Sequence, residues 1–271
     1  MTSRSTTKAK PRMNPNLSTA DLAQAPSWWL LALESRAPFE LGASILASPL
    51  LHYAARGDGH PVLVLPGLAA GDLTTLPLRQ FLQDRGFKPY GWELGPNYGP
   101  RAGVLESCIA RLRELRREHG CKISLVGWSL GGVYARELAK MLSEDVRDVI
   151  TLGSPFTGNP RASNAWRLFE FASGKKVGDA KLHEQIKRTP PVPTTSIYSR
   201  TDGIVAWQCS LEKNTARSES IEVVASHVGL GMNPAAFYAI ADRLAQPEGR
   251  WKPFHRDGWR RWAFPDPDRP A

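Results

Sequence analysis

The chain has 271 residues, 42% of them apolar, which is enough to bury a full core in one domain. Its net charge of +9 is concentrated at the ends, because residues 1–12 hold four basic and no acidic residues and residues 249–271 hold six basic and three acidic ones. This distribution argues against a uniformly basic nucleic-acid-binding surface. Three irregularly spaced cysteines argue against a disulfide framework or a CxxC metal site.

Residues 1–16 are polar, and no apolar run follows their positive charges, so they predict a disordered tail and not a secretory signal. No apolar run is long enough to cross a bilayer. The sequence therefore predicts a cytoplasmic protein with one globular domain over residues 17–248 and a basic aromatic tail over residues 249–271. Peripheral membrane contact stays open.

Residues 17–36 predict an amphipathic helix that begins near Ser18 and carries Trp28 and Trp29 on its apolar face. That face has two interpretations. It packs on the domain or lines its entrance, or it lies on a membrane surface. The segment is not notably basic, which favours packing.

From residue 61 onwards, apolar strands alternate with amphipathic helices. The predicted strands are 61–67, 88–92, 122–128, 146–154, 194–200 and 220–226, and the predicted helices are 74–85, 102–119, 130–142 and 234–245. This alternation is typical of an α/β fold with a mostly parallel, doubly wound sheet.

The longest interruption of this pattern is residues 155–193, which stand between two strands where a shorter crossover would suffice. An insertion of this size predicts a cap or lid over a substrate pocket. Its aromatic residues include Trp166 and Phe169. We assign these two, together with Trp128 and Phe156, to the predicted pocket.

The stretch GWSLGG places Ser129 in a G-x-S-x-G pattern between a predicted strand and a predicted helix. A serine there lies in a tight turn, and the flanking glycines avoid collisions with the neighbouring strand and helix. The Ser129 hydroxyl is then exposed at the carboxyl edge of the sheet, where ligands bind in open α/β folds. This context makes Ser129 a candidate nucleophile.

With these residues the chain resembles the α/β-hydrolase superfamily over about residues 50–245. In that family an acid and then a histidine follow the nucleophile, each after a later strand. Asp202 in RTDGIV and His227 in VVASHVGLG occupy those places. The resemblance implies that His227 is the general base, that Asp202 orients it, and that the backbone N–H groups of Leu130 and Leu68 form the oxyanion hole.

The segments LGSPFTG and RTDGIV look like the lipase-like branch of the family, although Phe156 stands where that branch often has a histidine. We expect a serine carboxylic-ester hydrolase, an esterase or lipase, that acts on an apolar acyl ester. An acyltransferase with the same triad is the alternative, and a non-catalytic binding protein of this fold is a weaker one. No metal or cofactor is expected, because the other histidines lack ligand spacing.

Two further segments have an unusual composition. GPNYGPRAG, residues 95–103, lacks the lysine of a phosphate loop and predicts a loop near the mouth of the site. The C-terminal tail interleaves arginines with Trp259, Trp262 and Phe264. It folds back on the domain, enters a lipid headgroup layer or stacks on bases, with packing favoured. The oligomeric state is left open.

Overall fold

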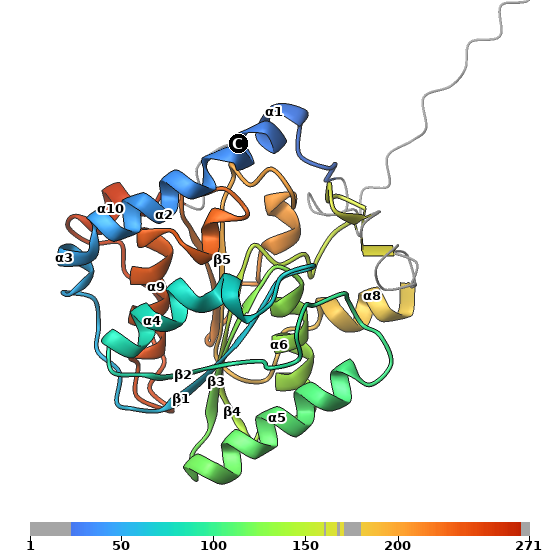
Figure 1. Ribbon diagram of the computed structural model, residues 1–271, viewed down its shortest axis with the longest axis vertical. Coiled ribbons are helices and arrows are strands. Elements are labelled where there is room, and N and C mark those ends of the chain that lie inside the picture. The colour runs from blue at the N-terminus through green and yellow to red at the C-terminus, as the bar shows by residue number, and fades with distance from the viewer. Residues whose placement is uncertain (1–22, 160, 167–168, 171–179, 267–271) are drawn as a thin grey trace, which may run out of the picture.

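A six-stranded parallel sheet forms the centre of the structure, a computed structural model that describes residues 23–159, 161–166, 169–170 and 180–266. The strand order is β2-β1-β3-β4-β5-β6 (Figure 1). The strands are β1 Pro61–Leu65, β2 Lys88–Gly91, β3 Ile123–Trp128, β4 Val146–Leu152, β5 Thr194–Tyr198 and β6 Ser218–Glu222. Every residue of β1 and β3 is buried, as expected for central strands covered on both faces.

Helices cover both faces of the sheet (Figure 1). On one face α4 (Leu76–Asp84) and α9 (Pro234–Leu244) pack on strand residues such as Val62 and Val126. On the other face α5 (Val104–His119) and α6 (Leu130–Met141) pack on the alternate residues, such as Leu63 and Leu125. The predicted doubly wound α/β fold is therefore confirmed.

The N-terminal helical segment differs from the predicted helix over residues 17–36. Its described part is α1 Trp28–Ala32, a 3-10 turn at Leu33–Arg36, α2 Ala37–Leu46 and α3 Ser48–Leu51. Ser27 caps α1 by accepting a hydrogen bond from Leu30 N, so the helix begins later than predicted, and Ser18 lies outside the described residues. The helical segment continues past residue 36 as two new helices, α2 and α3. Pro38 and Pro49 are compatible with them because each stands in a first turn, where the backbone N–H has no acceptor within the helix.

The last strand is shifted from its predicted position at 220–226. β6 pairs with β5 from Thr194 opposite Ser218 to Tyr198 opposite Glu222, so it begins earlier and ends earlier. The strand begins with polar residues, and the charge of the buried Glu219 is satisfied by Arg243, at 2.8 Å. The residues after Glu222 leave the sheet and form the loop that carries His227.

The C-terminal segment folds back onto α9. Phe264 is fully buried, and Trp259 packs edge-on against Tyr238 of α9 at 4.9 Å between ring centroids. The short helix α10, Arg260–Ala263, lies between these two contacts in sequence. Within the described ranges no helix is long and apolar enough to cross a membrane. The insertion at 155–193 is described only in part and includes α8, Ala180–Lys187.

Candidate active site

Ser129 occupies the turn between β3 and α6 with a backbone conformation that is rare for a non-glycine residue. Its φ is 53° and its ψ is −120°. The turn is held in place because Ser129 N donates to the carbonyl of Leu152 at the end of β4, at 2.8 Å. Strain of this kind costs free energy and persists at functional sites where the surrounding structure enforces it.

The glycines around Ser129 are required by close packing. A Cβ atom at Gly127 would collide with the backbone of Gly131 and Gly132, and one at Gly131 would collide with the carbonyl of Leu65. The start of α6 therefore lies directly against β3 and the end of β1. This contact presents the serine above the carboxyl edge of the sheet.

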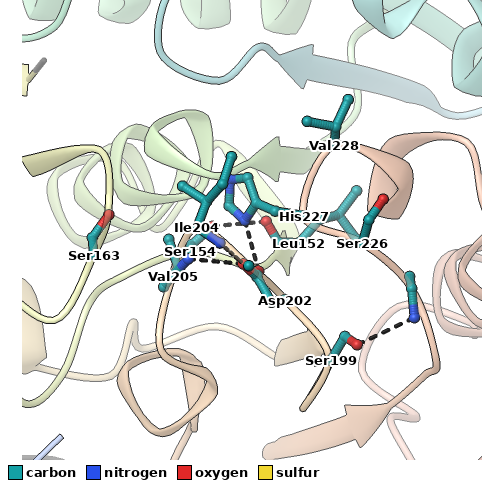
Figure 2. Close-up of polar contacts among 12 residues, drawn as sticks. Leu152, Ser154, Ser163, Ser199, Asp202, Ile204, Val205, Ser226, His227 and Val228 are labelled. Carbon is teal, nitrogen blue, oxygen red and sulfur yellow. Dashed lines mark hydrogen bonds and ion pairs between the residues drawn. The ribbon is translucent and has the colours of Figure 1, made fainter. Parts of the chain in front are cut away.

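Asp202 and His227 form a buried hydrogen-bonded pair (Figure 2). His227 Nδ1 lies 2.7 Å from Asp202 Oδ2, and each residue is 4% exposed. The other carboxylate oxygen, Oδ1, accepts from Ile204 N at 2.8 Å and from Val205 N at 2.7 Å. Because a carboxylate only accepts hydrogen bonds, the proton lies on His227 Nδ1 and the lone pair lies on Nε2.

Two contacts bring this pair to the serine. The indole Nε1 of Trp128, the residue before Ser129, donates to the carbonyl of His227 at 3.0 Å. Gly153, just after β4, lies beneath the pair, since a Cβ atom there would be 3.1 Å from both Asp202 Oδ2 and His227 Nδ1. The three sequence-predicted residues thus gather at the carboxyl ends of β3, β5 and β6.

The surroundings of His227 shift its pKa. Burial lowers the pKa, but the charge of Asp202, the hydrogen bond with Asp202 and the charge of Glu34 outweigh burial and raise it above its ordinary value. A raised pKa makes the imidazole a stronger base. It also means that the base is lost to protonation at a higher pH than for a free histidine.

Glu34, in the N-terminal segment, is a residue that the sequence interpretation missed. Its Oε1 accepts from Gly203 N at 2.7 Å and from His227 N at 2.9 Å, and its Oε2 accepts from Val228 N at 3.0 Å. One carboxylate therefore joins the loop of the acid to the loop of the histidine. Gly203 permits this, because any Cβ there would collide with the backbone of Leu30.

Arg36 and Glu40 extend the same attachment. Arg36 donates to the carbonyl and the hydroxyl of Thr201, and Glu40 accepts from Ser226 N at 2.7 Å. With Glu34, these are the only charged residues between residues 23 and 55. Three isolated charges in a long apolar segment were the available sequence signal, since charges that are not needed for solubility usually have a partner.

Replacing Glu34 with glutamine is expected to lower kcat/KM about tenfold, because the amide nitrogen cannot accept the hydrogen bond from Val228 N. Loss of the negative charge should also lower the pKa of His227 and move the acidic limb of the kcat/KM profile to lower pH. The measurement is the pH dependence of ester hydrolysis. Glu40→Gln is the control, and its limb should stay in place. If the acidic limb of the kcat/KM profile of Glu34→Gln stays in place, Glu34 has only a structural role.

The predicted oxyanion donors, Leu68 and Leu130, belong to two segments that border Ser129. Leu130 is the first residue of α6, where backbone N–H groups have no acceptor within the helix. Leu68 follows Gly67, whose added Cβ would lie 3.2 Å from Ser129 Cβ, so this loop borders the serine directly. We assign the oxyanion hole to these two N–H groups as a proposal that rests on their placement.

Asn97 holds the Leu68 loop and was also missed. It is fully buried, its Nδ2 donates to Pro66 O at 2.8 Å, and its backbone exchanges hydrogen bonds with Ala69 and Ala70. It belongs to the 95–103 segment that was predicted to lie near the mouth of the site. The prediction placed the loop, but no pattern singled out this asparagine.

The predicted pocket residues separate into two groups. Trp128 and Phe156 are both buried. The indole of Trp128 donates to the carbonyl of His227, and the guanidinium carbon of Arg136 lies 3.7 Å from the ring centroid of Phe156. Phe156 thus belongs to the core, and its assignment to a pocket is withdrawn. Trp166 and Phe169 are partly exposed in the insertion. Their segment borders the acid loop, where Asn164 Nδ2 donates to Gly203 O at 2.7 Å.

A second hydrogen-bonded group of Asp, His and Ser side chains lies near the amino ends of β1 and β3. Asp58 contacts His60 Nδ1, His60 Nε2 lies 2.9 Å from Ser124 Oγ, and Ser124 Oγ donates to Asp148 at 3.0 Å. Ser124 is fully buried in the sheet, and burial raises the pKa of Asp148 to about 7. Its serine is buried within strand β3 and does not stand in a strand-to-helix turn, so we interpret this hydrogen-bonded group as structural.

The parallel sheet, the strained serine turn and the later Asp and His define a serine hydrolase of the α/β-hydrolase superfamily. The sequence model of the serine hydrolase (FSH1) family matches residues 74–234, which include Ser129, Asp202 and His227. The chain belongs to that family. The predicted resemblance to the superfamily and the predicted enzyme class are both confirmed.

Solved structures with similar folds include several lipases. Aspergillus fumigatus lipase B has a TM-score of 0.55 and 18% identity, over 69% of this chain and 52% of that one. Bacillus licheniformis lipase BlEst2 has a TM-score of 0.56 and 15% identity, over 72% and 95%. This chain therefore spans about half the length of lipase B. No curated protein matches this chain. At these identities the likeness supports the fold alone.

Proposed function

We propose that this protein hydrolyses carboxylic esters with a Ser129–His227–Asp202 triad through an acyl-enzyme intermediate. The observation that supports it best is the buried Asp202–His227 pair, whose histidine carbonyl accepts from the residue preceding the strained Ser129. Family membership supports hydrolase chemistry. The ester substrate is our inference from the site and from the lipases among the structural relatives.

In the first half-reaction Ser129 Oγ attacks the ester carbonyl carbon while His227 Nε2 takes its proton. The carbonyl oxygen becomes an oxyanion, which the N–H groups of Leu68 and Leu130 stabilise. The C–O bond to the alcohol then breaks, and His227 gives the proton to the departing alkoxide. The acyl group stays on Ser129.

In the second half-reaction a water molecule replaces the alcohol. His227 takes a proton from the water, whose oxygen attacks the acyl carbon, and returns that proton to Ser129 as the ester bond breaks. Asp202 keeps Nδ1 protonated throughout and stabilises the imidazolium. The products are a carboxylic acid and the restored serine. An acyltransferase would differ only in the acceptor, an alcohol or amine in place of water.

We also propose that residues 161–166 and 169–170 of the insertion line an acyl pocket. Its described residues Trp166 and Phe169 are aromatic and partly exposed, and residues 162–164 are bonded to the acid loop, for example through Asn164 N and Ile204 O at 2.7 Å. An apolar wall next to the site favours an apolar acyl chain over a charged one.

A series of p-nitrophenyl esters of increasing acyl length tests this function. The expected result is steady turnover whose kcat/KM rises with chain length until the pocket is filled, by roughly three- to fourfold for each buried methylene. Trp166→Ala should flatten this rise while leaving acetate turnover within about twofold. Trp262→Ala, which removes an exposed tryptophan elsewhere, is the matched control.

The outcomes separate the alternatives. A single burst of p-nitrophenol without steady turnover, which an added alcohol restores, would support an acyltransferase and contradict hydrolysis. No burst and no turnover with any ester would contradict both enzymes.

A further inference from the structure

The outer surface of the N-terminal helical segment, residues 28–53, is strongly apolar. Of the seventeen large apolar side chains that are exposed in the described part of the chain, nine lie in this segment. Leu46 is 84% and Phe39 is 79% exposed. Trp28 and Trp29 do not pack on the domain, because they are exposed and stack on each other at 3.7 Å between ring centroids, and the alternative that they line its entrance stays a prediction. Monomeric proteins rarely expose an apolar surface of this kind unless it binds something.

The charges of this segment are all used on its inner side. Glu34, Arg36 and Glu40 are bonded to the loops that carry Asp202 and His227, as described above. The outer face from Trp28 to Tyr53 therefore carries no carboxylate, lysine or arginine, and its exposed polar side chains include Ser35, Ser48 and His52. This arrangement is the reverse of an ordinary surface helix, whose charged face meets water.

A basic aromatic element stands on the neighbouring helix. α9 packs against α2 and α3, and it also carries α10 through the Tyr238–Trp259 contact. Figure 1 shows α10 at the same end of the molecule as α2 and α3. Trp259, Arg261 and Trp262 are exposed there, and residues 249–266 hold five basic and two acidic residues.

We propose that the outer face of residues 28–53, together with α10, docks on a lipid bilayer that carries anionic headgroups. Tryptophan and tyrosine are favoured at the boundary between headgroups and acyl chains, leucine and phenylalanine enter the acyl region, and arginine binds lipid phosphates. The chain supplies all three kinds of contact on adjoining elements.

The charge of the protein favours lipid over a second copy of the chain as the occupant. The net charge is +9, and a twofold dimer across this face would bring two basic C-terminal segments towards each other. Like charges oppose that association, whereas an anionic bilayer gains from every basic residue near its surface.

Cosedimentation of the full chain with phosphatidylcholine vesicles, with and without phosphatidylglycerol, tests this docking surface. We expect binding that is stronger with phosphatidylglycerol and weaker at high salt. The double variant Leu46→Glu, Leu50→Glu should bind at least about tenfold more weakly. Arg261→Gln should lose about fivefold on the anionic vesicles only. Met141→Glu, on the opposite side of the sheet and 52% exposed, should bind like the wild type.

Thermal unfolding followed by circular dichroism verifies that each variant is folded. The proposal is overturned if the wild type stays in the supernatant with both vesicle types, or if Met141→Glu loses as much binding as the double variant. A dimer that Leu46→Glu, Leu50→Glu splits, without vesicle binding, would assign the face to a second copy instead. None of these measurements uses turnover, so their failure leaves the ester hydrolase proposal unaffected.

Discussion

Ser129→Ala is expected to lower kcat for ester hydrolysis by roughly a millionfold, the loss that follows when a triad nucleophile is removed. The backbone of the turn should persist, because the hydrogen bond from residue 129 N to Leu152 O does not use the side chain. A fluorophosphonate probe should label the wild type at Ser129, identified by peptide mass spectrometry, and should leave the variant unlabelled.

Ser124→Ala is the matched control, since Ser124 Oγ lies 2.9 Å from a histidine ring nitrogen, His60 Nε2. It is fully buried, so this variant should keep its labelling and turnover even if the lost hydrogen bonds reduce stability by about 1–3 kcal/mol. Labelling of Ser129→Ala at another serine, or loss of labelling in Ser124→Ala with the fold intact, would remove Ser129 from its proposed role.

Asp202→Asn is expected to lower kcat about ten-thousandfold without unfolding the site. The reason is specific to this loop. Ile204 N and Val205 N both donate to Oδ1, so the amide oxygen of asparagine must take that position and its NH2 group must face His227. Nδ1 would then have to accept, which moves the proton to Nε2 and removes the base. Fluorophosphonate labelling should slow in parallel with hydrolysis.

Asp148→Asn is the control for that variant. Asp148 is a half-buried aspartate that accepts from Ser124 near the amino ends of the strands, and its pKa of about 7 means that the neutral acid is already populated at neutral pH. A neutral asparagine should be tolerated there, with activity within about twofold of the wild type. Comparable losses in both variants would indicate a general effect of replacing an aspartate in the sheet region and would contradict the orienting role of Asp202.

The fold and the three triad candidates could be predicted because their signals are local. β1 and β3 are continuous apolar runs, and Ser129 lies among glycines whose need is visible from the turn itself. Asp202 and His227 each follow a strand, and parallel strands bring their carboxyl ends to one edge. Even the shifted bounds of β6 did not disturb this, because His227 remains in the loop that leaves that edge.

The residues that hold the candidate site could not be predicted, because their partners are distant in sequence. Glu34 bonds backbone N–H groups of residues 203, 227 and 228, and backbone groups leave no trace in the identity of those residues. Phe156 was misplaced for a related reason: an aromatic side chain near the site is equally consistent with a pocket wall and with a core position. Only the contact with Arg136 decides between them.

Residues 28–53 have an apolar outer face and an inner side that is bonded to the loops of Asp202 and His227. Shortening the chain would remove both. Removing this segment to obtain a better-behaved protein would expose the three backbone donors that Glu34 satisfies, and would free the loops of the acid and the base at once. The exposed side chains of Phe39, Leu46 and Leu50 can instead be exchanged for polar residues one by one, which keeps the carboxylate of Glu34 in place. An investigator who needs a less adhesive enzyme should therefore redesign this segment and keep it in place.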